Sequence, residues 1–330
     1  MKLRVGDLVE VRSVDEILKT LDSSGALDLL PFMPEMLVYC GKRFKVWKRV
    51  HKTCDTIYYD GTREIKNVVM LDQLRCDGSA HGGCQAACSI FWKEAWLKRV
   101  GTETRASLGN ADQNHSPSRC TVETLYQKAR NECETAEGPD LTYSCQATEM
   151  RNATTRLPPL RLGQYFEDVS SGNVSILELI KGFLIWCYNT IQKKRRGGEY
   201  PYLKGKPGKT PRVTLNLQPG ELVQVRSRDE IVDTVDVRLR NRGLSFDREM
   251  VRYCGGTYKV LRRVEKLVNE KTGKMMQVPN DCLVLDGVIC VGHLNRFCPR
   301  SVYPYWREIW LKRADGCSEN DVQSVPPAGK

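Results

Sequence analysis

The chain has 330 residues, of which 41% are hydrophobic and 28% charged, and its formal net charge is +11. This composition is typical of a globular protein and excludes a wholly disordered chain. The length allows two or three domains. The first residues are charged, and no run reaches the roughly 18 apolar residues of a membrane-spanning helix, so we expect a cytoplasmic protein without a transmembrane segment.

Four blocks of the sequence recur at an offset of 214 residues. The block "GDLVEVRSVDEIL" from Gly6 returns as "GELVQVRSRDEIV" from Gly220, and "EMLVYCGKRFKVWKRV" from Glu35 returns as "EMVRYCGGTYKVLRRV" from Glu249. The blocks "LDQLRC" and "FWKEAWLKR" recur at the same offset as "LDGVIC" and "YWREIWLKR". A single shared offset predicts a duplicated chain. The predicted regions are a first copy at 1–100, a middle region at 101–219, a second copy at 220–314 and a flexible tail at 315–330.

Each copy is predicted to be mainly β with one short helix. The alternation of apolar and polar residues in "LVEVRS" and "FKVWKRV" is typical of half-buried strands. Ser13 with Glu16, and Ser227 with Glu230, fit the capping box at the start of a helix. A turn is expected at Tyr39-Cys40-Gly41 and at its counterpart in the second copy. The repeated tryptophans of "FWKEAW" and "YWREIW" are expected in the core.

The strand "GDLVEVRS" followed by "YCGKRFKV" resembles the opening strands of SH3-like barrels, such as those of KOW modules and of the nitrile hydratase β subunit. The resemblance covers about half of each copy and implies two tandem SH3-like barrels. It carries over no catalytic residue. The whole chain also resembles bacterial cysteine-rich duplicated proteins. The expected fold class is therefore α+β, mainly β, with the two barrel copies flanking a mostly helical middle region.

The chain contains 14 cysteines and four histidines. In a reducing compartment, closely spaced thiols bind metal or perform redox chemistry more often than they form disulfides. Three cysteine pairs keep the offset of 214, while most loop residues around them differ. These pairs are Cys40 with Cys254, Cys76 with Cys290, and Cys84 with Cys298. They are the predicted core of one metal site in each copy.

The fourth ligand is left open by the sequence. In the first copy Cys54, His81 and Cys88 are available, and in the second copy His293 and Cys282 are, although we expect Cys282 in the core. An alternative grouping uses Cys54, Cys76, Cys84 and Cys88 alone, so that only the first copy binds metal. Zinc is the default metal of a small closed site, and an iron–sulfur cluster is the alternative.

Two helices are expected in the middle region, from about Thr121 to Cys133 and through "SILELIKGFLIWCYNTIQKKRR". Ser175 and Glu178 fit a cap for the second helix, whose apolar residues leave only a narrow polar stripe. We favour a helix buried between the two copies, with Cys187 in the core. A helix lying on a membrane surface is the alternative.

Residues 193–212 contain eight basic residues and one acidic residue, so this segment holds most of the net charge. It predicts a local anionic partner, which is a lipid surface, a nucleic acid or an acidic protein. The candidate contact residues are Lys193, Lys194, Arg195 and Arg196. A lipid partner would place the protein at the periphery of a membrane.

The chain shows none of the common nucleotide-binding, serine-hydrolase or zinc-protease motifs, and the sequence identifies no catalytic residue. The expected function is that of a metal-binding, and by default zinc-binding, binding or scaffolding factor. One alternative is a metalloenzyme or redox protein with an open site in the first copy. Another is a nucleic-acid-binding module.

Overall fold

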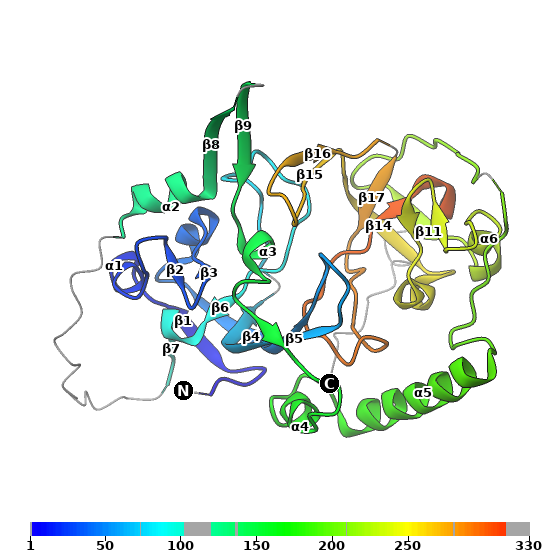
Figure 1. Ribbon diagram of the computed structural model, residues 1–330, viewed down its shortest axis with the longest axis horizontal. Helices are drawn as coiled ribbons and strands as arrows, with labels where there is room; N and C mark the ends of the chain where they lie inside the picture. Colours follow the sequence, from blue (N-terminus) through cyan, green and yellow to red (C-terminus); the bar gives the residue numbers. More distant parts are fainter. Residues whose placement is uncertain are drawn as a thin grey trace. The chain divides into compact units, whose positions relative to one another are not determined.

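The computed structural model describes residues 2–72, 74–101, 120–135, 138–208, 210–279 and 281–314, which form an α+β protein of antiparallel sheets and short helices (Figure 1). The chain divides into two compact units. Unit 1 comprises Met1–Asn173 and Val268–Met276, and unit 2 comprises Val174–Leu267 and Gln277–Lys330. The middle region expected at 101–219 therefore contributes to both units. The tail expected at 315–330 lies outside the described residues.

The main sheet of unit 1 has the strand order β10-β5-β4-β1-β7, and β6 also pairs with β5. Its strand β1 alternates as predicted, because Val9 and Val11 are buried while Leu8 is exposed. Two hairpins, β2–β3 and β8–β9, lie outside this sheet. The strands of unit 1 are β1 (Leu8–Val11), β2 (Ala26–Leu27), β3 (Leu30–Pro31), β4 (Arg43–Cys54), β5 (Thr62–Leu71), β6 (Trp92–Lys93), β7 (Leu97–Arg99), β8 (Arg130–Thr135), β9 (Gly138–Tyr143) and β10 (Thr155–Arg156).

The helices of unit 1 are short. The first begins with the predicted capping box, in which Ser13 and Glu16 exchange backbone-to-side-chain hydrogen bonds. The turn at Gly41 is also present, with φ +75°, but the chain enters it from a 3-10 helix instead of a strand. The helices are α1 (Val14–Leu18), η1 (Pro34–Tyr39), η2 (Glu94–Trp96), α2 (Val122–Ala129), α3 (Gln146–Glu149) and α4 (Gly163–Ser170).

The helix expected from Thr121 to about Cys133 is too long by one turn. It ends at Ala129, because the next six residues form β8 and pair with β9. Local helix propensity is thus overridden by hairpin pairing.

The core of unit 1 is built around Trp92 and Trp96, which are fully buried. Phe32 meets both rings edge-to-face, at centroid distances of 6.2 and 5.2 Å. The expectation that these tryptophans belong to the core is confirmed.

Unit 2 repeats this arrangement. Its sheet has the order β18-β17-β14-β11-β19. The pairing of Leu222 with Lys259 reproduces that of Leu8 with Lys45, at the offset of 214 residues. Trp306 and Trp310 are fully buried, and Cys282 is buried as expected. The elements that follow unit 1's main run are α5 (Ile176–Arg195), β11 (Leu222–Val225), α6 (Arg228–Val232), β12 (Arg240–Asn241), β13 (Leu244–Ser245), η3 (Arg248–Tyr253), β14 (Thr257–Arg263), β15 (Lys266–Val268), β16 (Met275–Gln277), β17 (Cys282–Leu285), β18 (Trp306–Arg307), η4 (Glu308–Trp310) and β19 (Leu311–Arg313).

Both units contain the same buried ion pair. In unit 1 the guanidinium of Arg49 lies 2.5 Å from the carboxylate of Glu94, and in unit 2 Arg263 lies 2.6 Å from Glu308. Each carboxylate also accepts a backbone N–H bond of 3.0 Å, from Leu3 and its counterpart Leu217. The pair therefore fastens the chain segment before β1 or β11 to the 3-10 helix that precedes the last strand.

Within the described strands, neither main sheet closes on itself by pairing of its end strands. The antiparallel α+β class is as expected. A closed barrel is not formed by these pairings.

The expectation that the long helix is buried is wrong. α5 begins with the predicted cap of Ser175 and Glu178, but none of its residues is buried. Cys187 is half-buried instead of belonging to the core. The half-buried face of α5 mixes polar residues with Leu179, Gly182 and Ile185, and most of its large apolar side chains lie on the exposed part of the helix. No helix in the described part of the chain is long and apolar enough to cross a membrane.

Candidate metal centre

Three side chains with different donor atoms meet in unit 1. Glu35, Cys76 and His81 each offer one ligand atom, and these atoms all lie within 4.8 Å of one another. Glu35 and His81 are buried, and Cys76 is half-buried. A carboxylate oxygen, a thiolate and an imidazole nitrogen are all zinc-type ligands. This group can hold a metal ion.

Two structural features bring the group together. Glu35 lies in the first turn of η1, which begins at Pro34, and its Oε1 accepts the backbone N–H of Ala80 at 3.0 Å. Cys76 and His81 lie on the 76–88 loop, which follows β5 and is closed by a 2.9 Å bond from the N–H of Cys76 to the carbonyl of Cys88. Glu35 therefore ties the loop to η1.

The loop turns sharply at Gly78. Its carbonyl accepts the N–H groups of His81, at 3.0 Å, and of Gly83, at 2.9 Å. Gly78 has φ +76°, and a Cβ atom there would overlap the backbone of Cys84. Only glycine fits this position without displacing the loop that carries His81.

The environment of His81 points to a cation between it and Glu35. His81 Nε2 lies 3.1 Å from the carbonyl of Ser144, so Nε2 carries the proton and Nδ1 of the neutral ring is a lone pair. Nδ1 lies 2.6 Å from Glu35 Oε1. Within the described residues, the buried Oε2 of Glu35 has no hydrogen-bond partner, and Nδ1 is paired with Glu35 alone. A lone pair facing a carboxylate is repulsive unless a proton or a metal ion lies between them.

Other thiols surround Cys76. Burial raises the pKa of the Cys76 thiol far above its usual value, and Glu35, Cys88 and Cys145 raise it further. Burial also raises the pKa of Cys145 to about 11, with a smaller contribution from Cys84. Cys76 and Cys145 are therefore protonated at neutral pH when no cation is bound. A metal ion would replace the proton of Cys76.

The residues predicted from the sequence are only partly brought together. The structure places Cys76 and His81 in the group and adds Glu35. Among the described residues, the other predicted ligands form no further group of three donors within that distance. Cys84 instead accepts the backbone N–H of Val268 at 3.3 Å. The other predicted ligands are Cys40, Cys54, Cys84, Cys88, Cys254, Cys290, His293 and Cys298.

The second copy has the same loop without the histidine. Glu249, the counterpart of Glu35, accepts the backbone N–H of Leu294 at 2.5 Å. Asn295 occupies the position of His81. Burial raises the pKa of Glu249, which shows the cost of an ionised carboxylate at this position even with Arg252 nearby.

Sequence reasoning missed Glu35, although a signal was present. Glu35 and Glu249 begin a repeated block, and Glu35 is the one carboxylate in the otherwise apolar stretch "PFMPEMLVY". Both are buried in the structure. A charged residue retained at a buried position in both copies indicates a fixed partner.

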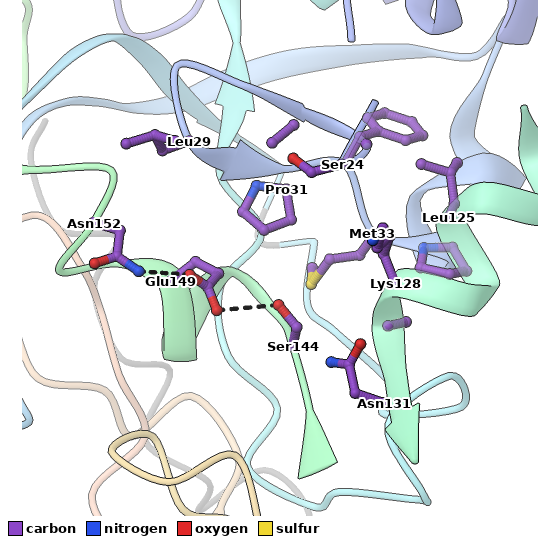
Figure 2. A pocket seen from close by; sticks show the side chains of 15 residues that line it. Ser24, Leu29, Pro31, Met33, Leu125, Lys128, Asn131, Ser144, Glu149 and Asn152 are labelled. Atoms are coloured by element: carbon purple, nitrogen blue, oxygen red, sulfur yellow. Dashed lines mark hydrogen bonds between the residues drawn. The ribbon is translucent and has the colours of Figure 1, made fainter. Parts of the chain in front are cut away.

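A pocket of about 460 Å³, whose lining is drawn in Figure 2, includes Ser144, the residue whose carbonyl contacts His81. Residues of the β2–β3 hairpin and of η1 form one side, and residues of α2, β8 and α3 form the other. Ser144 connects pocket and group, because its carbonyl binds His81 while its hydroxyl donates to Glu149 at 3.1 Å. Asn152 also donates to Glu149, at 2.7 Å.

The basic segment is partly neutralised by acidic neighbours. Lys193 pairs with Glu199 at 3.4 Å, Lys206 with Asp233 at 2.8 Å, and Arg212 with Asp281 at 3.1 Å. Among the described residues, Lys194, Arg195 and Arg196 form no ion pair. Their charge is available to a partner.

A scan of protein-family models, a search of curated proteins and a search of solved structures each found no match to this chain.

Proposed function

We propose that the protein is a metal-binding scaffold in which Glu35, Cys76 and His81 of the first copy bind one divalent metal ion. The observation that carries the proposal is the meeting of three buried or half-buried donor atoms within 4.8 Å. The close approach of His81 Nδ1 to Glu35 Oε1, at 2.6 Å, and the buried, unpartnered Oε2 of Glu35 support it. The metal would fasten the 76–88 loop to η1.

Zinc suits this donor set best. It accepts carboxylate, thiolate and imidazole ligands together, and its structural sites are closed by four ligands. Cys88 and Cys145 are the candidates for the fourth ligand, since both thiols act on the pKa of Cys76. An iron–sulfur cluster is less well supported, because only one of the three grouped donors is a thiol.

A structural role is favoured over a catalytic one. The second copy closes the equivalent loop with the same backbone bond, of 2.8 Å from Cys290 to Val302, and with Asn295 where the first copy has His81. The loop therefore folds without the histidine, and the metal adds rigidity to it. Rigid loops on a duplicated scaffold are suited to binding a partner.

The SH3-like resemblance remains part of this proposal. β18 and β19 lie at opposite ends of the strand order in unit 2, yet only the three residues of η4 separate them. This connection must bring the two ends of the sheet near each other, as in an SH3-like barrel. Two such copies would provide the binding scaffold.

A metalloenzyme is the second candidate, and the pocket favours it. Catalytic zinc sites use three protein ligands and leave one position open. The pocket shares Ser144 with the group, so a substrate bound there would lie near the metal. In that case Glu149, which lines the pocket, would be the candidate acid or base for the bound substrate.

Elemental analysis of the purified full chain tests the proposal. We expect about one zinc ion per chain, with loss of the metal in Cys76→Ser and in His81→Asn, which copies the residue of the second copy. The matched control is Cys290→Ser, which should retain the metal. Two zinc ions per chain, or metal retained by Cys76→Ser, would contradict the proposal. If the folded protein takes up no metal, the proposal fails, and the group is only a buried ion pair between His81 and Glu35.

A further inference from the structure

The surface of α5 is independent of the metal centre, and its orientation is set by two contacts within unit 2. Phe297 packs against Gly182 so closely that a Cβ atom there would overlap its ring. Glu178 lies 3.9 Å from His293. Gly182 and Glu178 are four residues apart, so they share one face of the helix. That face packs on the protein, and the opposite face is directed away from it.

The opposite face carries a stripe of large apolar side chains. At about 100° per residue, six of them fall within an arc of about 120°, on the side of α5 opposite Glu178 and Gly182. Their exposed fractions range from 48% for Tyr188 to 79% for Leu177. Phe183 and Trp186 stack beside them, with ring centroids 5.8 Å apart. The stripe consists of Ile176, Leu177, Ile180, Leu184, Tyr188 and Ile191.

The stripe ends in positive charge. Lys194 and Arg195 fall within the same arc, one turn beyond Ile191. With Arg196 they form the basic group that has no ion pair among the described residues. An apolar face is thus continued by cations on the same side of the helix.

We propose that α5 lies in the surface of an anionic lipid bilayer, with the stripe among the acyl chains and Lys194, Arg195 and Arg196 at the anionic headgroups. The helix is not apolar enough to cross a membrane, which fits a helix lying parallel to the surface. Tyr188, at the edge of the stripe, is a side chain that favours the membrane interface.

Charge favours lipid over a second copy of the chain. Two α5 helices packed in parallel would place their basic ends together. Packed antiparallel, each basic end would meet an N-terminal turn whose one acidic residue is Glu178. That carboxylate already accepts hydrogen bonds from the backbone and side chain of Ser175. Anionic headgroups provide a counter-charge that neither arrangement supplies.

The test is sedimentation of the full chain with phosphatidylcholine vesicles that contain or lack phosphatidylserine. We expect binding only to the anionic vesicles. Replacing Ile180 and Leu184 by glutamine should weaken binding at least about tenfold, because exposed side chains on the stripe lose their apolar contact with the bilayer. The control Val237→Gln removes an exposed apolar residue of the same unit, 67% exposed, and should bind normally.

A second variant tests the charge. Changing Lys194, Arg195 and Arg196 to glutamine should weaken binding by roughly a hundredfold, at about 1 kcal/mol per charge. A control with the same loss of net charge replaces Arg238, Arg240 and Lys312 by glutamine and should bind normally.

Three outcomes would overturn the proposal. The first is no binding to anionic vesicles by the folded wild-type chain. The second is binding that the Ile180/Leu184 variant retains. The third is a dimer, seen by analytical ultracentrifugation, that this variant abolishes, because the stripe would then be an interface between two copies.

Discussion

The 76–88 loop and the 290–302 loop show what duplication preserved and what it changed. Each loop is closed by a backbone bond, of 2.9 Å in the first copy and 2.8 Å in the second, and each is tied to a buried glutamate. Among the three positions of the metal group, the difference lies at one, where His81 faces Glu35 but Asn295 stands in the second copy. The loop conformation is therefore the shared feature, and the histidine that completes the group belongs to the first copy alone.

The largest expected effect comes from breaking the buried ion pairs that both copies share. Glu94→Ala removes one of the two carboxylates that pair with Arg49, whose side chain is 6% exposed, and leaves Glu167 at 2.8 Å as the other. We expect a loss of about 3–5 kcal/mol in the free energy of unfolding. Arg263 likewise keeps a second carboxylate, Asp281 at 3.0 Å, but its side chain is 22% exposed, so Glu308→Ala should cost less. Urea unfolding followed by tryptophan fluorescence measures both.

The control for this comparison is Glu132→Ala, which removes an exposed ion pair with Arg130. It should change stability by less than about 1 kcal/mol. A larger loss for Glu308→Ala than for Glu94→Ala would contradict the order of burial on which the prediction depends.

The turn glycines come next. Gly78→Ala and Gly292→Ala should each cost about 2–3 kcal/mol, because both residues have positive φ and a Cβ atom would overlap the backbone of Cys84 or Cys298. Gly6→Ala is the matched control. It has φ +88° with nothing within 4 Å, so it should cost only about 1 kcal/mol. Thermal melts of the three variants measure these losses of stability. Equal losses in all three would show that overlap with the Cβ atom is unimportant.

The buried glutamates should respond differently to removal of their charge. Glu35→Gln should lose the metal, since an amide is a poor ligand for zinc.

Burial raises the pKa of Glu249, so its contribution to stability is present below pH 4.5 and is lost as the pH rises through the folded-state pKa. Glu249→Gln should therefore gain stability relative to the wild type as the pH increases. Unfolding curves between pH 4 and 8 measure this, and a constant difference would contradict it.

The smallest effect is expected at the two capping boxes. The hydrogen bond with Lys98 is the main cause that lowers the pKa of Glu16 to about 2, and hydrogen bonds with Ser227 lower that of Glu230 to about 2. Their stabilising effect is present above pH 4.5 and is lost as the pH falls towards 2. Both carboxylates are exposed, so Glu16→Gln and Glu230→Gln should each cost less than about 1 kcal/mol at neutral pH. If either variant were less stable than the wild type by the same amount at pH 2 as at neutral pH, the ionised cap would not be the source of the loss.

Much of the fold could be predicted from local signals. The capping boxes at Ser13, Ser175 and Ser227, the alternating strands and the buried tryptophans are encoded within a few residues. The end of α2 could not be predicted, because it depends on pairing between β8 and β9. Nor could the exposure of α5, because composition does not reveal which face of a helix packs.

The candidate site was predicted in part for a similar reason. Cys76 and His81 share one glycine-rich loop, so their spacing indicated a metal ligand pair. Glu35 lies about 40 residues earlier in the sequence, and only the fold brings it to them. The separation of Cys84 from the group likewise follows from its contact with Val268, a residue of the second copy's sequence.

X-ray absorption spectroscopy of the zinc-loaded full chain is the most direct test of the proposed Glu35–Cys76–His81 site, because it counts the sulfur ligands. We expect a zinc ion with one or two sulfur ligands at about 2.3 Å and with nitrogen or oxygen as its other ligands at about 2.0–2.1 Å. In His81→Asn that signal should disappear. A site of four sulfur ligands would contradict the Glu35–Cys76–His81 assignment, and it would favour the all-cysteine cage of the first copy instead.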